Sequence, residues 1–304
     1  MSAPVESVAA RSGGAPNVQG LRADARRERL ALFGLSLPAL ALVLVTMVIP
    51  IGWLFGLSFV ADDGSWSLVH YRRMVEQPSY ARIFGATFQV SLLTTAICIV
   101  LGHPLAYVLS QLPRRAANLC LILVLLPFWT SLLVRTYAWL VLLQRRGLIN
   151  TWGIELGLWT DPLPLVHNLA GTLIGMVHIM LPFMVLPLFN SMRAIDGDCL
   201  KAAASLGASP ARAFWTVFFP LSLPGLFAGA LLVFVICLGF YVTPAVLGGG
   251  KVIMVSNQIA NDIELFFNWG AASSLGVVLL VSTLLLLWLA SRLMRLETLL
   301  GASR

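Results

Sequence analysis

Six stretches of the sequence carry no charged side chain and are separated by segments that do. They run over residues 31–61, 83–113, 116–134, 162–192, 213–250 and 265–291. A bilayer core of about 30 Å is crossed by roughly 20 apolar residues in a helix. The third run, of 19 residues, reaches that length by continuing past Arg135 to Leu143. All six runs are continuously apolar, whereas a membrane β-barrel shows segments of about 10 residues that alternate in polarity. The pattern therefore predicts an all-α, polytopic membrane helix bundle with six transmembrane helices, at about 33–60, 84–110, 117–143, 166–190, 221–247 and 270–293.

The composition supports this reading. Apolar residues make up 59% of the 304 residues and charged ones only 11%, against about 25% charged in an ordinary globular protein. A mean hydropathy of +0.88 leaves too little polar surface to cover a soluble particle. This excludes a cytosolic enzyme, a disordered chain and a disulfide scaffold, and it indicates an integral membrane protein.

Basic residues predict the orientation of the six helices. The N-terminal segment, the 111–116 and 191–220 loops and the C-terminal segment hold 13 of the 20 Lys and Arg residues, and the alternate segments hold six. Positive residues are enriched on the cytoplasmic side, so both termini are expected to be cytoplasmic. The net charge of +7 then reflects topology, and no nucleic-acid partner is expected.

We expect three regions along the chain. Residues 1–30 read as a disordered cytoplasmic N-terminal tail without the features of a removed signal peptide, residues 31–295 as the six-helix transmembrane domain, and residues 296–304 as a cytoplasmic C-terminal tail. The four cysteines have no metal-binding or disulfide spacing and are expected to be reduced and buried: Cys98, Cys120, Cys199 and Cys237. No metal site is predicted.

The long segment between the fourth and fifth helices predicts a helix, a turn and a second helix. Asp196 and Asp198 suit a helix N-terminus, and LKAAASL (200–206) is a strong helix former. Gly207 follows where a helix would need a left-handed residue at its end.

The second helix of this segment has its own start signal. Ser209 offers a hydroxyl cap and Pro210 occupies the first turn. The run ARAFWTVFF then forms the helix, and Pro220 is expected to break it before the fifth span. From these residues alone, a docking surface for a partner and an ordinary amphipathic connector on the membrane surface remain equally open.

The same segment resembles the EAA loop of bacterial ABC-importer permeases, whose pattern is E-A-A-x3-G-x9-I-x-L-P. Ala202, Ala203, Gly207 and Pro220 match at the right spacing, and Val217 and Phe219 are apolar replacements. Lys201 stands where the pattern has glutamate, which would reverse any ion pair made there. The resemblance implies that residues 196–220 are a coupling loop that inserts into a groove of a cytoplasmic ATPase.

Two further stretches are similar to segments of spermidine/putrescine-type permeases: PFWTSLLVRTYAWLVLL (127–143) and GFYVTPAVLGGGK (239–251). The resemblance, over residues 30–295, implies the type I ABC-importer permease (MetI-like) fold in a bacterial inner membrane. It also implies three partners: a second permease subunit of the same fold, a cytoplasmic ATPase dimer and a periplasmic substrate-binding protein. ATP would be hydrolysed by the ATPase, so no cofactor is expected in this chain. The expected cargo is a polyamine, spermidine or putrescine, and ferric iron, phosphonate or another small solute remains the alternative.

Five residues are candidates for a translocation path: Arg135, Tyr137, Trp139, Phe240 and Tyr241. An arginine inside a span is costly unless it faces protein or water. It could line a pore or position a gate, or it could bind a carbonyl or extend to the outer surface. The aromatic residues could form a throat that passes amines by cation–π contacts, or they could be an interfacial belt.

No acidic residue lies inside a predicted span, so substrate selection is expected to belong to the binding protein. Five acidic residues on the periplasmic side could help to dock the binding protein: Asp62, Asp63, Glu76, Asp262 and Glu264. The default interpretation is that they are solvated acids in loops.

Two other functional classes are disfavoured by the sequence. A secondary transporter usually has intramembrane acids or an inverted repeat, and neither is evident. An intramembrane enzyme needs paired catalytic side chains, and His103 and His178 have no obvious partner. GGGK (248–251) does not fit a phosphate loop, because Ala245 replaces the first glycine and Val252 replaces Ser or Thr.

Overall fold

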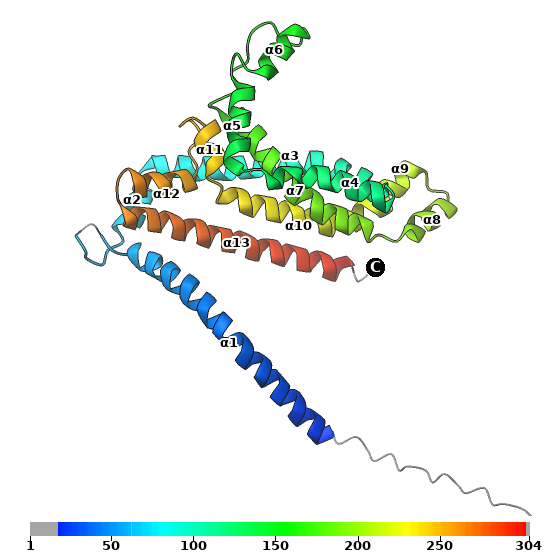
Figure 1. The fold of residues 1–304 in the computed structure, drawn as a ribbon, viewed down its shortest axis with the longest axis horizontal. Coiled ribbons are helices and arrows are strands. Elements are labelled where there is room, and N and C mark those ends of the chain that lie inside the picture. Colours follow the sequence, from blue (N-terminus) through cyan, green and yellow to red (C-terminus); the bar gives the residue numbers. More distant parts are fainter. Residues whose placement is uncertain (1–17, 62, 302–304) are drawn as a thin grey trace, which may run out of the picture. The chain divides into compact units, whose positions relative to one another are not determined.

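The computed structural model describes residues 18–61 and 63–301 (Figure 1). It divides the chain into two compact units, Met1–Leu54 and Phe55–Arg304, which are described separately. Most of helix α1 (Val18–Leu57) belongs to the first unit, and its Gly34–Leu57 part is apolar and long enough to cross a membrane.

Helix α1 begins earlier than predicted. Residues 18–30 are helical, so the predicted disordered tail is wrong for them, and residues 1–17 lie outside the described residues. RADARRERLAL (22–32) is rich in strong helix formers and contains no proline or glycine. Extending an existing helix backwards through such a sequence requires no new nucleation.

The second unit contains the remaining helices. In chain order they are α2 (Val69–Glu76), α3 (Pro78–Gln111), α4 (Arg114–Leu125), the 3₁₀ helix η1 (Leu126–Trp129), α5 (Leu132–Leu143), α6 (Leu148–Glu155), α7 (Leu169–Arg193), α8 (Gly197–Ser205), α9 (Pro210–Ala213), the π-helix η2 (Phe214–Phe218), α10 (Phe219–Leu238), α11 (Val242–Leu247), α12 (Val255–Glu264) and α13 (Trp269–Gly301). Among the described residues there is no β-strand, only an isolated bridge between Val60 and Trp66. The predicted all-α class is confirmed.

Within the part of the chain that the structure describes, five helical stretches are long and apolar enough to span a membrane, and a bent pair raises the number to six. The stretches are Gly34–Leu57, Pro78–Gln111, Leu169–Arg193, Pro210–Leu238 and Trp269–Arg292. Helix α13 continues to Gly301, so its end does not mark the expected domain boundary at residue 295, and residues 302–304 lie outside the described part of the chain.

The third predicted span is wrong as a single helix. The segments Arg114–Trp129 and Leu132–Glu155 meet at an angle of 93°. Pro127 lacks an N–H to continue the ladder, and the Thr130 hydroxyl donates to the Pro127 carbonyl at 2.7 Å. Thr130 itself is extended (φ −96°, ψ 148°). A proline followed by a side chain that bonds the local backbone ends the helix here.

The fifth predicted span differs at both ends. Pro220 does not break the chain into two helices: α9, η2 and α10 are continuous, and Pro210–Leu238 counts as one span. The π-turn changes the hydrogen-bond register just before the proline, which accommodates its missing donor. At the other end α10 stops at Leu238, and α11 is separate, so a single helix to residue 247 is also wrong.

The core lies where α3, α7 and α10 pack side by side. Its buried residues include Met180, Met184 and Val233. A β-carbon at Gly102 of α3 would lie 2.8 Å from Met184 Cγ, and one at Gly229 of α10 would lie 2.9 Å from Met184 Sδ. Met184 of α7 therefore fills a space that two glycines leave open, which holds the three helices close together.

The four cysteines are free, but they are not all buried as predicted. Cys98 and Cys237 are buried, Cys120 is half-buried and Cys199 is exposed. Cys199 lies on the short helix α8 rather than on a packed span, so no neighbouring helix covers it.

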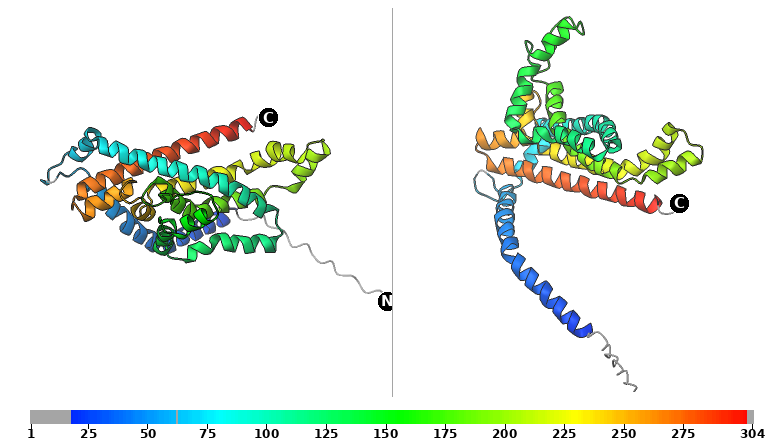
Figure 2. Two further views of the ribbon diagram at one scale, coloured as in Figure 1. Left: turned by 90° about the horizontal axis from the view of Figure 1, so that it is seen from above. Right: turned by 45° about the vertical axis from the view of Figure 1, so that its right-hand side comes forward.

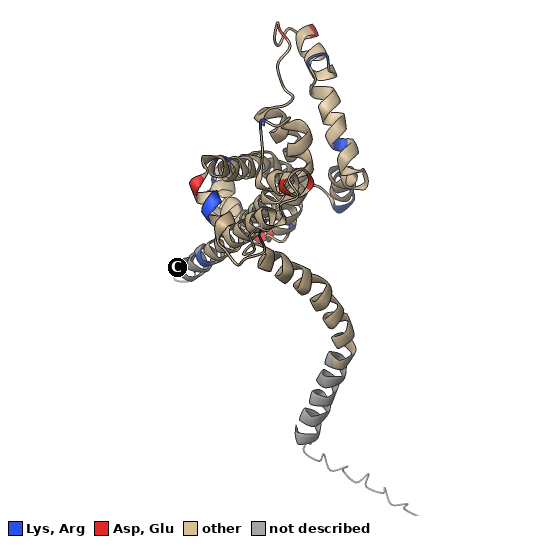
Figure 3. Ribbon diagram, turned by 90° about the vertical axis from the view of Figure 1, so that its left-hand side faces the viewer, with Lys and Arg blue, Asp and Glu red and all other residues tan. Residues whose placement is uncertain are grey.

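The two ends of the second unit differ in structure. Helices α8 and α9 lie at one end, which we call the α8 end, and α2 and α12 lie at the other, which we call the α12 end (Figures 1 and 2). In the end-on view of Figure 3, Lys, Arg, Asp and Glu colour only short parts of the ribbon. Helices α2, α6 and α12 were not predicted, because each has only 8–10 residues and lies outside the apolar runs.

Candidate coupling site and translocation path

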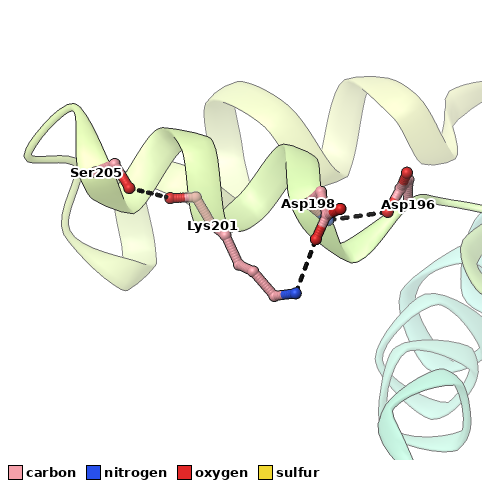
Figure 4. Close-up of polar contacts among 4 residues, drawn as sticks. All are labelled: Asp196, Asp198, Lys201 and Ser205. Carbon is pink, nitrogen blue, oxygen red and sulfur yellow. Dashed lines mark hydrogen bonds and ion pairs between the residues drawn. The ribbon is translucent and has the colours of Figure 1, made fainter.

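Helix α8 begins as its sequence predicts. The Asp196 side chain accepts a hydrogen bond from the Asp198 backbone N–H at 3.0 Å, which caps the first turn (Figure 4). Asp198 adds a second carboxylate near the positive end of the helix dipole. The three small residues Ala202–Ala204 follow without a charged side chain between them.

Lys201 is paired within its own helix. Its Nζ lies 2.7 Å from Oδ1 of Asp198, one turn earlier, and the two side chains are 81% and 76% exposed (Figure 4). An exposed pair of this kind contributes about 0.2–1 kcal/mol. The pair therefore matters little for stability, but it offsets the positive charge that replaces the glutamate of the EAA pattern.

Gly207 closes α8 in the left-handed conformation that was predicted. Its φ is +83°. The Gly207 N–H bonds the Ala204 carbonyl at 2.9 Å, and the Ala208 N–H bonds the Ala203 carbonyl at 3.0 Å. This turn satisfies the last carbonyls of the helix. The second helix then starts at Ser209, whose hydroxyl accepts from the Arg212 N–H at 3.4 Å.

An apolar groove of about 350 Å³ runs between the two arms of this segment. Its walls include Leu200 and Ala204 from α8, Ala208 from the turn and Phe218 from η2, and Tyr107 of α3 also lines it. Leu206 and Trp215 remain exposed nearby, at 88% and 64%. The segment therefore presents small and apolar side chains at the α8 end.

Aromatic rings connect the segment to α3. The Tyr107 ring meets Phe214 at 5.2 Å and Phe218 at 5.1 Å between centroids, both edge to face. His103, one turn earlier on α3, meets Phe219 at 5.4 Å. Edge-to-face packing is favourable and specific in geometry, so a displacement of η2 would be transmitted to α3.

A second connection ties α7 to the same place. Arg193, the last residue of α7, donates from Nη1 to the carbonyl oxygens of Ser110 at 3.1 Å and Leu112 at 2.8 Å. Carbonyls at the end of a helix such as α3 lack a partner within the helix. The ends of α3 and α7 are therefore joined where the 196–220 segment begins.

The candidate path residues of α5 fall into different environments. The Trp139 indole donates from Nε1 to Nδ1 of His178 on α7 at 3.0 Å, so His178 has the partner that the sequence did not reveal. Tyr137 is 54% exposed. Arg135 is half-buried, and its Nε has no hydrogen-bond partner among the described residues. Nε of Arg135 therefore does not donate to a backbone carbonyl of the described residues, which was one of the roles open to this arginine.

Phe240 and Tyr241 lie in the break between α10 and α11. Their carbonyl oxygens accept from the Ser256 hydroxyl at 2.6 Å and the Asn257 amide at 3.1 Å. Side chains of α12 thus satisfy backbone groups that the break leaves free, as irregular backbone at membrane depth requires. Within residues 34–292, no ring contact joins Tyr137 or Trp139 to Phe240 or Tyr241.

The helices that follow the two breaks, α5 and α11, contact each other. The Thr136 and Thr243 hydroxyls are 3.5 Å apart, which joins α5 to α11 beside the breaks. Broken helices are where transporters expose backbone and polar groups to cargo. No group of three or more His, Cys, Asp or Glu residues within the described chain could hold a metal ion.

The burial of Asp262 is not apparent from the sequence. Asp262 is predicted as a solvated loop acid, but it is 5% exposed on α12. Asp63, Glu76 and Glu264 are exposed as expected, and Asp62 lies outside the described residues.

The comparisons with known proteins agree with this architecture. Residues 14–296 match the model of a family described as binding-protein-dependent transport system inner membrane component. The chain is 34% identical over 250 residues to the spermidine/putrescine transport system permease protein PotB of Haemophilus influenzae, across 80% of this chain and 87% of that protein. It is equally similar to PotB of Escherichia coli K12, with 34% identity over 250 residues, 79% of this chain and 90% of that protein.

A solved structure shows the same fold. The chain superposes with a TM-score of 0.74 and 16% identity on a chain of a bacterial alginate ABC transporter in complex with an alginate pentasaccharide-bound periplasmic protein. The match covers 90% of this chain and 97% of that chain. The permease fold expected from the sequence is confirmed.

Proposed function

Because the chain belongs to the family of binding-protein-dependent transport system inner membrane components, which are multi-pass membrane subunits and not enzymes, we propose that it is the permease subunit of a bacterial ABC importer for polyamines. The observation that carries the proposal is 34% identity with spermidine/putrescine permeases over four fifths of the chain. Putrescine and spermidine are the proposed cargo.

In this proposal the α8 end is cytoplasmic and the α12 end is periplasmic. The bias of Lys and Arg towards the termini and the 196–220 segment supports this orientation. Both termini are then cytoplasmic, and α12 faces the side from which cargo arrives.

Four kinds of partner complete the transporter. A cytoplasmic ATPase dimer hydrolyses ATP, since this chain has no phosphate-binding loop of the required sequence. A second permease subunit of the same fold completes the path, a periplasmic binding protein selects and delivers the cargo, and membrane lipid surrounds the spans.

The 196–220 segment is the proposed contact with the ATPase. Lys201, Ala202 and Ala203 lie on α8, Gly207 sets the angle of the turn, and Pro220 follows the π-turn into α10. Closure of the ATPase dimer would push this segment. The ring contacts of Tyr107 and the Arg193 bonds would pass the movement to α3 and α7, and the rigid-body change would alternate access to the path.

The path itself is proposed along the breaks of the third and fifth spans. Arg135, Tyr137 and Trp139 lie on α5, which follows the first break, and Phe240 and Tyr241 lie in the second break. Since no ring contact joins the two sets within the described part of this chain, the aromatic surfaces would face the second permease subunit across the path.

Uptake by cells tests the proposed cargo. Radiolabelled spermidine and putrescine are supplied to a strain that lacks this gene and has no other polyamine system, with unlabelled amines, ferric iron and phosphonates as competitors. We expect saturable, ATP-dependent uptake to be lost and to be restored by the gene. Unchanged uptake would refute the polyamine cargo while leaving family membership in place.

A further inference from the structure

A polar cavity lies at the α12 end, away from the 196–220 segment and the helix breaks. It has a volume of about 400 Å³. It lies between the junction of α2 with α3 and the junction of α12 with α13. Pockets for small molecules hold roughly 300–1,000 Å³, whereas one water occupies about 30 Å³. The cavity is therefore large enough for an organic group.

Asp262 lines this cavity with an unused acceptor. The residue is 5% exposed, and its Oδ1 accepts from Nε2 of Gln258 at 2.8 Å. Its Oδ2 is buried and has no hydrogen-bond partner among the described residues. A buried carboxylate oxygen without a donor is costly, and that cost disappears when a charged donor binds.

The neighbouring cations do not supply this donor. Arg73 lines the same cavity but is exposed, and within the described residues the ion pairs are Arg72 with Glu76 and Lys201 with Asp198. His70 is committed through Nε2 to the Val60 carbonyl at 3.0 Å. In this structure, therefore, none of the described residues donates to Oδ2 of Asp262.

The lining favours an alkylammonium group over a metal ion. Hard cations such as Ca²⁺ take 6–8 oxygen ligands, whereas Asp262 is the one carboxylate among the described residues that line this cavity. Ile83 and Phe266 add apolar walls that would cover methylene groups.

We propose that this cavity binds an ammonium group that donates to Oδ2 of Asp262 while its alkyl chain lies against Ile83 and Phe266. The ammonium group can belong to a free amine or to a lysine of the binding protein. The inference does not depend on which solute the permease carries. Arg73, which lines the same cavity, is positively charged like the bound ammonium group. It would repel a second ammonium group, so a monoamine fits better than a diamine.

The first arm of the test uses a free amine. The full-length chain, in lipid nanodiscs with the subunits that co-purify with it, is titrated with n-butylamine by calorimetry near neutral pH. We expect Asp262→Asn to weaken binding roughly tenfold or more. Glu264→Gln, which removes an exposed acid from the same helix, should bind like the wild type. Arg73→Gln should bind more tightly, and it keeps the test valid if Asp262→Asn fails to fold.

The second arm uses the binding protein of the same transport system, with its lysines free or acetylated. If lysine is the source, acetylation and Asp262→Asn each weaken docking, and their effects do not add, because they remove the same interaction. If a free amine is the source, only the first arm responds. The proposal is overturned if folded Asp262→Asn binds butylamine and the binding protein as the wild type does, or if neither probe responds to Asp262→Asn or Arg73→Gln.

Discussion

At the scale of single residues, Lys201 shows how one substitution in a motif is accommodated. Its charge is offset by Asp198 at 2.7 Å on the same exposed helix face. A partner that docks on α8 would therefore meet a nearly neutral pair beside a run of alanines, whereas the EAA pattern presents a glutamate.

We predict that Lys201→Glu reduces transport severalfold without reducing the melting temperature by more than about a degree or two. The new carboxylate would be repelled by Asp198, but an exposed pair contributes only about 0.2–1 kcal/mol to stability. Transport and melting are measured on the same preparation, with Lys201→Arg as the control that keeps the pair. Full transport by Lys201→Glu would show that coupling does not depend on the charge at this position.

Asp262 gives a prediction about pH. Burial raises the pKa of Asp262, while the hydrogen bond from Gln258 and the charges of Arg73 and His70 act in the opposite direction. A carboxyl group with a raised pKa in the folded state binds its proton more tightly when folded. Its contribution to the free energy of unfolding therefore falls as pH rises through the raised pKa.

Asp262→Asn should accordingly melt at a higher temperature than the wild type near neutral pH. The difference should shrink as pH falls towards about 3.9, the ordinary pKa of aspartic acid. Glu264→Gln corrects for the loss of one negative charge. A difference that is absent near neutral pH, or that grows on acidification, would contradict the assigned shift.

The sequence predicts features that depend on neighbouring residues, such as helix caps and turns. It does not predict contacts between residues that are far apart in the chain. Asp196, Gly207 and Ser209 each act on backbone groups within three residues, so their roles follow from neighbours in the chain. Asp262 is buried by helices about 180 residues earlier, and His178 finds its partner 39 residues away. Neither contact leaves a local pattern.

At the scale of elements, the turn after α8 is the most specific feature. Gly207 has a φ of +83° and no atom within 4 Å of a β-carbon built on it. A side chain would therefore fit in space but would strain the backbone by roughly 1–2 kcal/mol, and more if β-branched.

We predict that Gly207→Val leaves membrane insertion intact but separates ATP hydrolysis from transport, since α8 would meet the ATPase at a different angle. Transport per ATP hydrolysed is the measurement. Gly197→Ala is the matched control, because Gly197 also has open space around it but no positive φ. Normal transport by a correctly inserted Gly207→Val would refute the role of the turn.

The ring contacts of Tyr107 on α3 with Phe214 and Phe218 on η2 lead to a second prediction at the scale of elements. Tyr107→Ala removes two edge-to-face contacts, each worth about 0.5–1.5 kcal/mol beyond burial. We expect it to lower transport per ATP, while Val108→Ala, on the exposed neighbouring position, changes little. Equal effects of the two variants would show that the rings do not transmit the movement.

Helix continuity was the part of the element pattern that sequence could not settle. The apolar runs located the spans, but hydropathy contains no information about the backbone hydrogen bonds that continue or end a helix. Pro127 and Pro220 look alike in the sequence, yet a bonded Thr130 ends the helix after the first and a π-turn carries the helix through the second.

At the scale of the whole molecule, the second unit links two distant regions through one packed core. The α8 end carries the 196–220 segment and the α12 end carries the Asp262 cavity. Between them α3, α7 and α10 pack around Met184, so a shift at one end reaches the other through rigid helices. Such a bundle suits alternation between two discrete states.

The most direct measurement is spermidine uptake into proteoliposomes that contain this chain, the second permease and the ATPase, with loaded binding protein outside and ATP inside. The account predicts uptake that requires ATP, the binding protein and this chain together, and that falls when Gly207→Val replaces the wild type. Uptake by this chain alone, without ATP or its partners, would contradict it.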